Sequence, residues 1–137
     1  LIRRFHEAKK VNSPYVIAWG DGSPRREFLH VDDMASASIY LMEIDKDLLN
    51  NHTTPMNSHV NIGAGEDLTI KELTEMISNI VQFKGEIKWD SSKPNGTPKK
   101  LLDSKLINKL GWRKSINLVD GLKNTYEWFL NQKALRY

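Results

Sequence analysis

A tryptophan and an arginine on either side of a tight turn are the residues of this sequence best suited to hold a ligand. Trp19 ends an apolar run, and Arg26 follows the turn Gly20-Asp21-Gly22-Ser23-Pro24. Glycine supplies positive φ angles and proline presets φ, so the turn favours a fixed geometry. An indole offers a flat apolar face, and a guanidinium is a planar, permanently charged fork. The pair suits a ligand that carries both a ring and a phosphate or carboxylate.

The same residues also fit a structural role. A tryptophan at the end of a strand is commonly part of the core, and the neighbours Arg26 and Glu27 are typical of a surface ion pair that contributes little. Arg4, on the first predicted helix, is a second guanidinium that could meet the same anion. From the residues alone, both interpretations stay open.

A second region where chemistry could take place is the loop from Asp90 to Lys100. It mixes turn-forming residues with three lysines. Composition alone favours a solvated connector, because loops of this kind usually run over the surface.

Three segments carry a resemblance to a known family. They are Leu1-Ile2-Arg3-Arg4-Phe5-His6-Glu7-Ala8, Arg26-Glu27-Phe28-Leu29-His30-Val31-Asp32-Asp33 and Ser92-Lys93-Pro94-Asn95-Gly96-Thr97-Pro98-Lys99-Lys100-Leu101-Leu102-Asp103. The second resembles the Arg-x-Phe-x-x-Val-x-Asp signature of extended short-chain dehydrogenase/reductases that act on nucleotide sugars. Together they resemble the members that convert GDP-4-keto-6-deoxy-D-mannose to GDP-L-fucose by epimerisation and NADPH-dependent reduction.

The resemblance implies a set of substrate-binding residues. The GDP-sugar contacts of the family correspond to Arg4, Trp19, Arg26 and Lys100, with Asn95 at a position where Asp also occurs. Their chemistry agrees with this, because charge-assisted hydrogen bonds from arginine and lysine suit a diphosphate and the indole suits a ring. We expect Arg26 to matter most, since it follows the Gly-Pro turn.

The resemblance also implies what lies outside these 137 residues. The family binds NADPH and holds its catalytic Ser, Tyr and Lys in an upstream Rossmann domain. Here no tyrosine has a lysine four residues later, and Gly63-Ala64-Gly65 lacks the third glycine of a dinucleotide-binding turn. We therefore expect residues 1–137 to be the C-terminal GDP-sugar-binding domain, with no catalytic or cofactor-binding residue, inactive by itself and forming a homodimer in the full-length enzyme.

Two alternatives remain. One is the substrate domain of another nucleotide-sugar epimerase or dehydratase, against which the run Ser92–Lys100 discriminates best. The other is a freestanding anion-binding module. The first helix argues against it, because no capping residue precedes Leu1, which is not Met, so the helix is expected to begin upstream and the chain to be a fragment.

The periodicity predicts an α/β fold with short strands and packed helices, related to the NAD(P)-binding Rossmann-like superfamily. Expected strands are Tyr15–Trp19, joined to a second strand by the turn as in a hairpin, Val60–Ile62 and Glu86–Trp89. Expected helices are Leu1–Lys10, Asp33–Asp47, Ile70–Val81, a short one after Asp103 that stops at Gly111, and Leu118–Leu130.

Polar residues at the predicted helix ends indicate how the helices begin and stop. Asp32 or Asp33 is expected to cap the second helix, and both His30 and Asp32 are expected to be architectural. Thr69 and Glu72 fit a capping box. Asp103 is expected to cap the short helix, and Gly85 to close the helix that starts at Ile70.

Composition sets the class of partner. The net charge of +3 suits an anionic ligand, but the lysines form no long basic tract, so nucleic acid is a weak interpretation. Cysteine is absent and the four histidines stand singly, so a metal site is not expected. No apolar run approaches the length of a membrane span, and a cytoplasmic location is compatible with the sequence.

Overall fold

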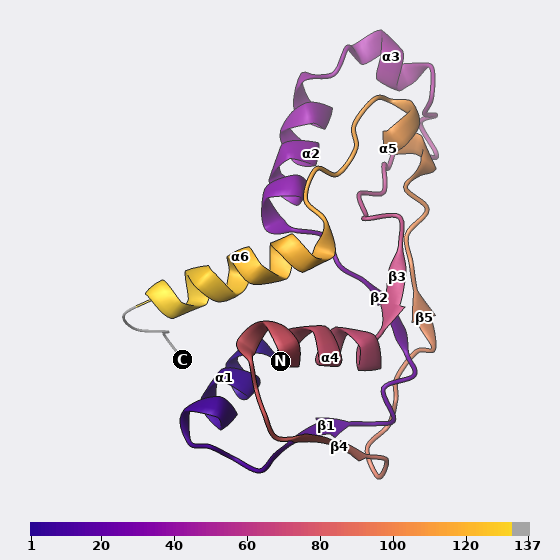
Figure 1. Ribbon diagram of the computed structural model, residues 1–137. Helices are drawn as coiled ribbons and strands as arrows, with labels where there is room; N and C mark the ends of the chain where they lie inside the picture. Colours follow the sequence, from indigo (N-terminus) through magenta and orange to yellow (C-terminus); the bar gives the residue numbers. More distant parts are fainter. Residues whose placement is uncertain (133–137) are drawn as a thin grey trace. The chain divides into compact units, whose positions relative to one another are not determined.

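The computed structural model describes residues 1–132 and has the mixed α/β character that the sequence predicts (Figure 1). In chain order the elements are α1 (Ile2–Lys10), β1 (Tyr15–Trp19), β2 (Arg25–Glu27), α2 (Val31–Glu43), α3 (Lys46–Asn50), β3 (Asp67–Thr69), α4 (Ile70–Val81), β4 (Glu86–Asp90), β5 (Lys99–Lys100), α5 (Lys105–Lys109) and α6 (Leu118–Asn131). No helix in residues 1–132 combines the length and the apolar character needed to cross a membrane.

The chain divides into two compact units. The first unit contains Leu1–Arg26, Leu68–Lys99 and the segment that starts at Val119, and the second contains Glu27–Asp67 and Lys100–Leu118. Each unit has a cluster of buried apolar residues of its own.

The first unit is built on two parallel strands. β1 and β4 pair in register from Tyr15 with Glu86 to Trp19 with Asp90. Along β1 the side chains of Val16 and Ala18 are buried while the alternate ones are exposed, as expected for a strand with one face on a core.

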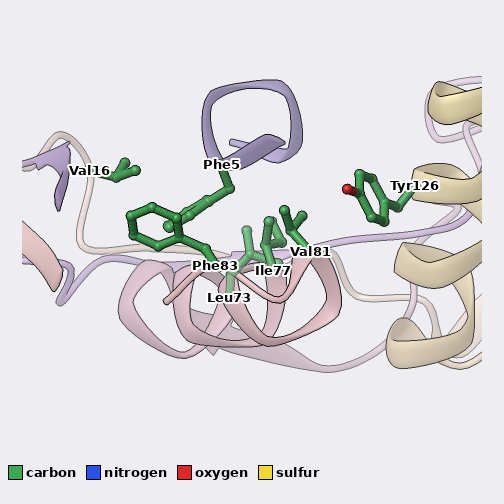
Figure 2. Packing of buried hydrophobic residues seen from close by; sticks show 7 residues of the cluster. All are labelled: Phe5, Val16, Leu73, Ile77, Val81, Phe83 and Tyr126. Atoms are coloured by element: carbon green, nitrogen blue, oxygen red, sulfur yellow. The ribbon is translucent and has the colours of Figure 1, made fainter. Parts of the chain in front are cut away.

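Helices α1, α4 and α6 complete the core of the first unit. Phe5 of α1 lies over the α4 residues Leu73, Ile77 and Val81, and Phe83 meets Phe5 edge to face with ring centroids 5.5 Å apart (Figure 2). Phe5 and Val81 are fully buried. The predicted apolar stripe of α6 is confirmed as core, because Tyr126 is buried in this cluster with Leu122 and Phe129 packed against it.

Helix α4 has the start that the sequence predicts and a different stop. The Thr69 side chain accepts from the Glu72 amide while the Glu72 carboxylate accepts from the Thr69 amide, which completes the capping box. The helix ends at Gln82, which adopts a left-handed conformation with φ 61°, so the prediction that Gly85 closes it is wrong. Gly85 instead allows a close approach to the loop that precedes β1, because a Cβ at this position would lie 2.7 Å from the Pro14 carbonyl oxygen.

The second unit contains α2, α3 and α5. Ala37, Ile107 and Trp112 form its buried cluster, and the Trp112 indole Nε1 donates to the Ser36 hydroxyl at 2.8 Å. The predicted stop of α5 is confirmed, since Gly111 follows it with φ 112°.

The start of α2 differs from the prediction. His30 is the capping residue, and its Nδ1 accepts from the Asp32 amide at 3.2 Å, so the assignment of Asp32 or Asp33 as the cap is wrong while His30 is indeed architectural. Asp33 is buried and accepts hydrogen bonds from the amide and hydroxyl of Ser115 and from the amide of Ile116. The donors to this carboxylate are 82 and 83 residues away in the sequence, which helix periodicity could not reveal.

Two further helix boundaries are corrected. The predicted helix Asp33–Asp47 is interrupted, because Ile44 is extended with ψ 146° and Asp45 caps the separate helix α3 by accepting from the Leu48 amide. The position before α5 is occupied by Ser104, one residue after the predicted Asp103. Asp103 still accepts from the Lys105 amide at 3.0 Å, so it satisfies one of the first N–H groups.

Two strand predictions are wrong. β1 and β2 do not form a hairpin: β1 pairs with β4, whereas β2 lies between β3 and β5 in a three-stranded sheet. The segment Val60–Ile62 is not a strand, although its two apolar side chains pack on the cluster of the second unit as their alternation suggests. The short strands β3 and β5 were not predicted, because two or three residues carry too little alternation to be recognised.

Candidate ligand-binding site

The carboxyl ends of β1 and β4 lie together and carry the two loops of the candidate site. The pair ends at Trp19 and Asp90, and the Gly20 amide continues it by donating to the Asp90 carbonyl at 2.9 Å. The loops that follow are 20–24 and 91–98. Ligands of α/β proteins commonly bind outside the carboxyl ends of parallel strands, so this edge is a suitable place for a site.

Trp19 stands exposed at this edge. The residue is 67% exposed, and it follows Tyr15 and Ile17 on the open face of β1. The Lys93 ammonium lies 5.9 Å from the centroid of the Trp19 ring, within range of a cation–π contact. The structure therefore places Trp19 outside the core, in contact with a cation that the sequence did not single out.

Arg4 reaches the same strand from α1. Its Nη1 donates to the Ile17 carbonyl oxygen at 2.8 Å, two residues before Trp19. A guanidinium has five N–H donors, and this bond uses one of them. The contact aligns an exposed arginine with the strand that ends in the indole.

Asn95 joins the two loops. Its Oδ1 accepts from the Asp21 amide at 2.9 Å and lies 2.3 Å from where a Cβ on Gly20 would be. Gly20 also has a φ of 77°, so this position requires glycine for both backbone angle and space. Asn95 therefore holds the late loop against the turn that follows Trp19.

The turn and the loop are stiffened by two carboxylates. Hydrogen bonds from the hydroxyl and then the amide of Ser23, with a further contribution from Asn95, hold the pKa of Asp21 below its usual range. The Ser92 hydroxyl does the same for the pKa of Asp90, assisted by the Ser92 amide. Both carboxylates are ionised at neutral pH and hold their turns in shape.

Arg26 lies beside the same late loop. It is half-buried, and its Nη1 donates to the Arg25 carbonyl at 2.7 Å. Its Nη2 is 3.7 Å from the position that a Cβ on Gly96 would take. The Arg25 amide donates to the Pro98 carbonyl at 2.8 Å, which fixes the strand that carries Arg26 against the loop.

The predicted site residues thus fall into two groups. Arg4, Trp19, Arg26 and Asn95 all belong to the first unit, where β1 and the loop 91–98 connect them. Lys100 is exposed on β5 and belongs to the second unit.

Glu27 is a functional candidate that the sequence alone indicates only as part of a surface ion pair. The Glu27 carboxylate accepts from the Gly65 amide at 2.7 Å and from the Leu102 amide at 3.1 Å. Its donors are 38 and 75 residues away, and no local pattern marks them.

Comparison with known proteins gives one family and several close relatives. A model of the NAD dependent epimerase/dehydratase family matches residues 1–63. A GDP-L-fucose synthase of Escherichia coli is 53% identical over 99% of this chain and 43% of its own length, and GDP-L-fucose synthase 1 of Arabidopsis thaliana is 48% identical over 99% of this chain and 39% of its own length. The chain therefore spans less than half of these relatives.

A solved structure agrees. The GDP-mannoheptose C4 reductase MlghC of Campylobacter jejuni, with NADP bound, superposes with a TM-score of 0.82 at 38% identity, over 95% of this chain and 43% of that one. Both the resemblance and the fold class expected from the sequence are confirmed by these similarities.

Proposed function

We propose that this chain, a member of the extended short-chain dehydrogenase/reductase family, is the GDP-sugar-binding part of a GDP-L-fucose synthase. Similarity to two GDP-L-fucose synthases over nearly the whole chain supports this, and so does the basic, aromatic character of the site. The observation that carries the proposal is the meeting of the loop 91–98 with both the turn after Trp19 and the guanidinium of Arg26.

Each site residue has a role that its chemistry supports. Arg26 and Arg4 bind the diphosphate through charge-assisted hydrogen bonds, and Trp19 packs on a ring of the ligand. Asn95 keeps the loop in place, so its effect on binding is mainly through Asp21 and less through the ligand. Lys100 adds a point charge to the binding of the anionic ligand.

The full-length protein then converts GDP-4-keto-6-deoxy-D-mannose to GDP-L-fucose by epimerisation and reduction. The family and an NADP-bound relative support NADPH as the cofactor. We place the NADPH site and the catalytic Ser, Tyr and Lys outside residues 1–137, so this part alone is proposed to bind GDP-sugar without turnover. The homodimer and the cytoplasmic location stay predictions.

The test is the affinity of the full-length protein for GDP at fixed salt. Loss of a charge-assisted hydrogen bond costs roughly 1.5–3 kcal/mol, so Arg26→Ala should weaken GDP binding about ten- to a hundredfold. Arg26→Lys should recover only part, because a point charge cannot reproduce the bidentate geometry. Fixed salt is needed because screening alone weakens loose surface pairs.

Two controls decide the interpretation. Arg25→Ala changes the same charge one position earlier and should leave the affinity nearly unchanged. If Arg25→Ala weakens binding and Arg26→Ala does not, the register of the site is wrong by one residue. UDP in place of GDP separates the proposal from a related nucleotide-sugar enzyme: tighter binding of UDP would overturn the assignment to GDP-sugars.

A further inference from the structure

Glu27 holds two distant backbone segments with one side chain. Its Oε1 accepts from the Gly65 amide at 2.7 Å, and its Oε2 accepts from the Leu102 amide at 3.1 Å. The two carboxylate oxygens would lie 2.6 and 2.8 Å from a Cβ at position 63, so the carboxylate needs glycine there. The sequence supplies Gly63 at the position against which the side chain packs.

This arrangement calls for a carboxylate in particular. Both partners are N–H donors, and an ionised carboxylate accepts through both oxygens. A glutamine of nearly the same shape has one accepting oxygen, and its NH₂ group would face the other donor. The site therefore distinguishes Glu from Gln although the two differ little in size.

The segment held in this way carries Lys100. Leu102 follows Lys100 by two residues, and both belong to the second unit together with Glu27 and Gly65. Fixing the Leu102 amide restricts the backbone from which the lysine side chain extends. Glu27 also follows Arg26 directly in β2, and successive side chains of a strand point to opposite faces. Glu27 can therefore accept hydrogen bonds from the two backbone amides on the face opposite to the proposed ligand contact of Arg26.

We infer that Glu27 is a positioning residue that holds the Lys100 segment in place for GDP binding. The inference deepens the proposed function and rests on it for the role of Lys100. Glu27 does not contact the ligand in this scheme; it acts through the Leu102 amide.

The first measurement is amide hydrogen exchange in the full-length protein. An amide released from a hydrogen bond exchanges faster, so Glu27→Gln should speed exchange at Leu102, Gly65 or both, and leave α4 unchanged. Glu43→Gln, at an exposed carboxylate at the end of α2 in the same unit, removes the same charge and should change neither amide. Unchanged exchange at both Leu102 and Gly65 in Glu27→Gln would overturn the inference.

The second measurement is a double-mutant cycle on GDP affinity with Glu27→Gln and Lys100→Ala. Alone, Glu27→Gln should weaken GDP binding roughly two- to tenfold, the range of one lost hydrogen bond. In the Lys100→Ala background the same change should have little further effect, because contacts in one network are not additive. An equal loss in both backgrounds would mean that Glu27 acts on the structure in general, which overturns the inference.

Two provisions keep the test decisive. Should Glu27→Gln fail to fold, Glu27→Asp keeps the charge but is one methylene shorter, and faster exchange at Leu102 or Gly65 is expected of it too. If the parent protein does not bind GDP, the proposed function fails, and exchange at the two amides still decides whether Glu27 holds them.

Discussion

The two units each contain an alternating apolar segment, but within the described residues only the segment of the first unit forms a β-strand. In the first unit, the alternating segment Tyr15–Trp19 has a partner in β4, and it forms a strand with one face on the core. In the second unit, Val60 and Ile62 also alternate and pack on a buried cluster, but the segment is not a strand. Alternation thus predicts where side chains go, whereas a strand also requires a backbone partner.

The units differ in their cores as well. The first unit buries three large aromatic side chains with aliphatic residues of α4 and β1, and the second buries a smaller set around Trp112. In the second unit, the carboxylates of Asp33 and Glu27 also accept hydrogen bonds from backbone amides that are distant along the chain.

The largest expected effect tests whether each unit is stabilised by its own cluster. Phe5→Ala empties a fully buried position in the first unit and should lower the free energy of unfolding by about 3–5 kcal/mol. Ile107→Ala, fully buried in the second unit, should cost about 2–5 kcal/mol. Denaturant unfolding gives the totals, and hydrogen exchange should show faster opening of α4 in the first variant and of α2 in the second. Equal opening of both helices by both variants would contradict the comparison.

A medium effect on stability is expected from the buried carboxylate of Asp33 in the second unit. Burial raises the pKa of Asp33, but hydrogen bonds from Ser115 and Ile116 together outweigh it, so the pKa lies below its usual range. The stability from this ionised group is therefore present above the unfolded pKa of roughly 3.9 and is lost as pH falls through the lower folded pKa.

Asp33→Asn tests this directly. Asparagine keeps one accepting oxygen, but its NH₂ group would face either the Ser115 donors or the Ile116 amide and cannot accept from them. The variant should therefore lose about 1–3 kcal/mol of stability at neutral pH. The loss should shrink below roughly pH 4, where the unfolded carboxyl is protonated. Thermal unfolding of both proteins between pH 3 and about pH 7 measures it. A loss of stability that is the same at every pH would exclude stabilisation by the ionised Asp33 carboxylate.

The smallest expected effect is a difference in stability between alanine substitutions at two glycines that have the same φ angle. Gly20 and Gly65 both have φ 77°, so alanine costs roughly 1–2 kcal/mol of backbone strain at either. At Gly20 the new Cβ would also displace the Asn95 side chain, whereas at Gly65 no atom lies within 4 Å. Gly20→Ala should therefore be less stable than Gly65→Ala by about 0.5–1.5 kcal/mol, one hydrogen bond.

The Asn95 contact can be checked in the same series. In an Asn95→Ala background the difference between Gly20→Ala and Gly65→Ala should disappear, because the displaced group is gone. A difference that persists would show that Asn95 does not restrict Gly20. Chemical denaturation of the four proteins supplies these values.

Local signals account for the parts of the fold that were predicted. Thr69 and Glu72 are three residues apart, and the capping box they form sets the start of α4. The apolar spacing of this helix is short-range, and its predicted range Ile70–Val81 agrees with the structure. Errors occur where a local signal competed with a distant partner, as when Asp33 was assigned to cap α2 and instead binds the segment at Ser115.

The candidate site shows the same division. Trp19, Arg26, Arg4 and Lys100 can be proposed from the sequence because their side chains are aromatic or ionic and because the family resemblance points to them. Glu27 lies in the same motif, but its role depends on the Gly65 and Leu102 amides. A backbone N–H has no sequence signature, so its partner can be found only in three dimensions.

By itself, therefore, the sequence determined the family resemblance, the helices with strong periodicity and the residues that are proposed to bind a GDP-sugar. Tertiary structure alone decided that β1 pairs with β4 and not with β2, and that Asn95 holds the turn after Trp19. It also decided that the carboxylates of Glu27 and Asp33 accept hydrogen bonds from backbone amides far along the chain. The physical reason is that propensity and periodicity act over a few residues, whereas hydrogen-bond partners and close contacts are set by the path of the whole chain.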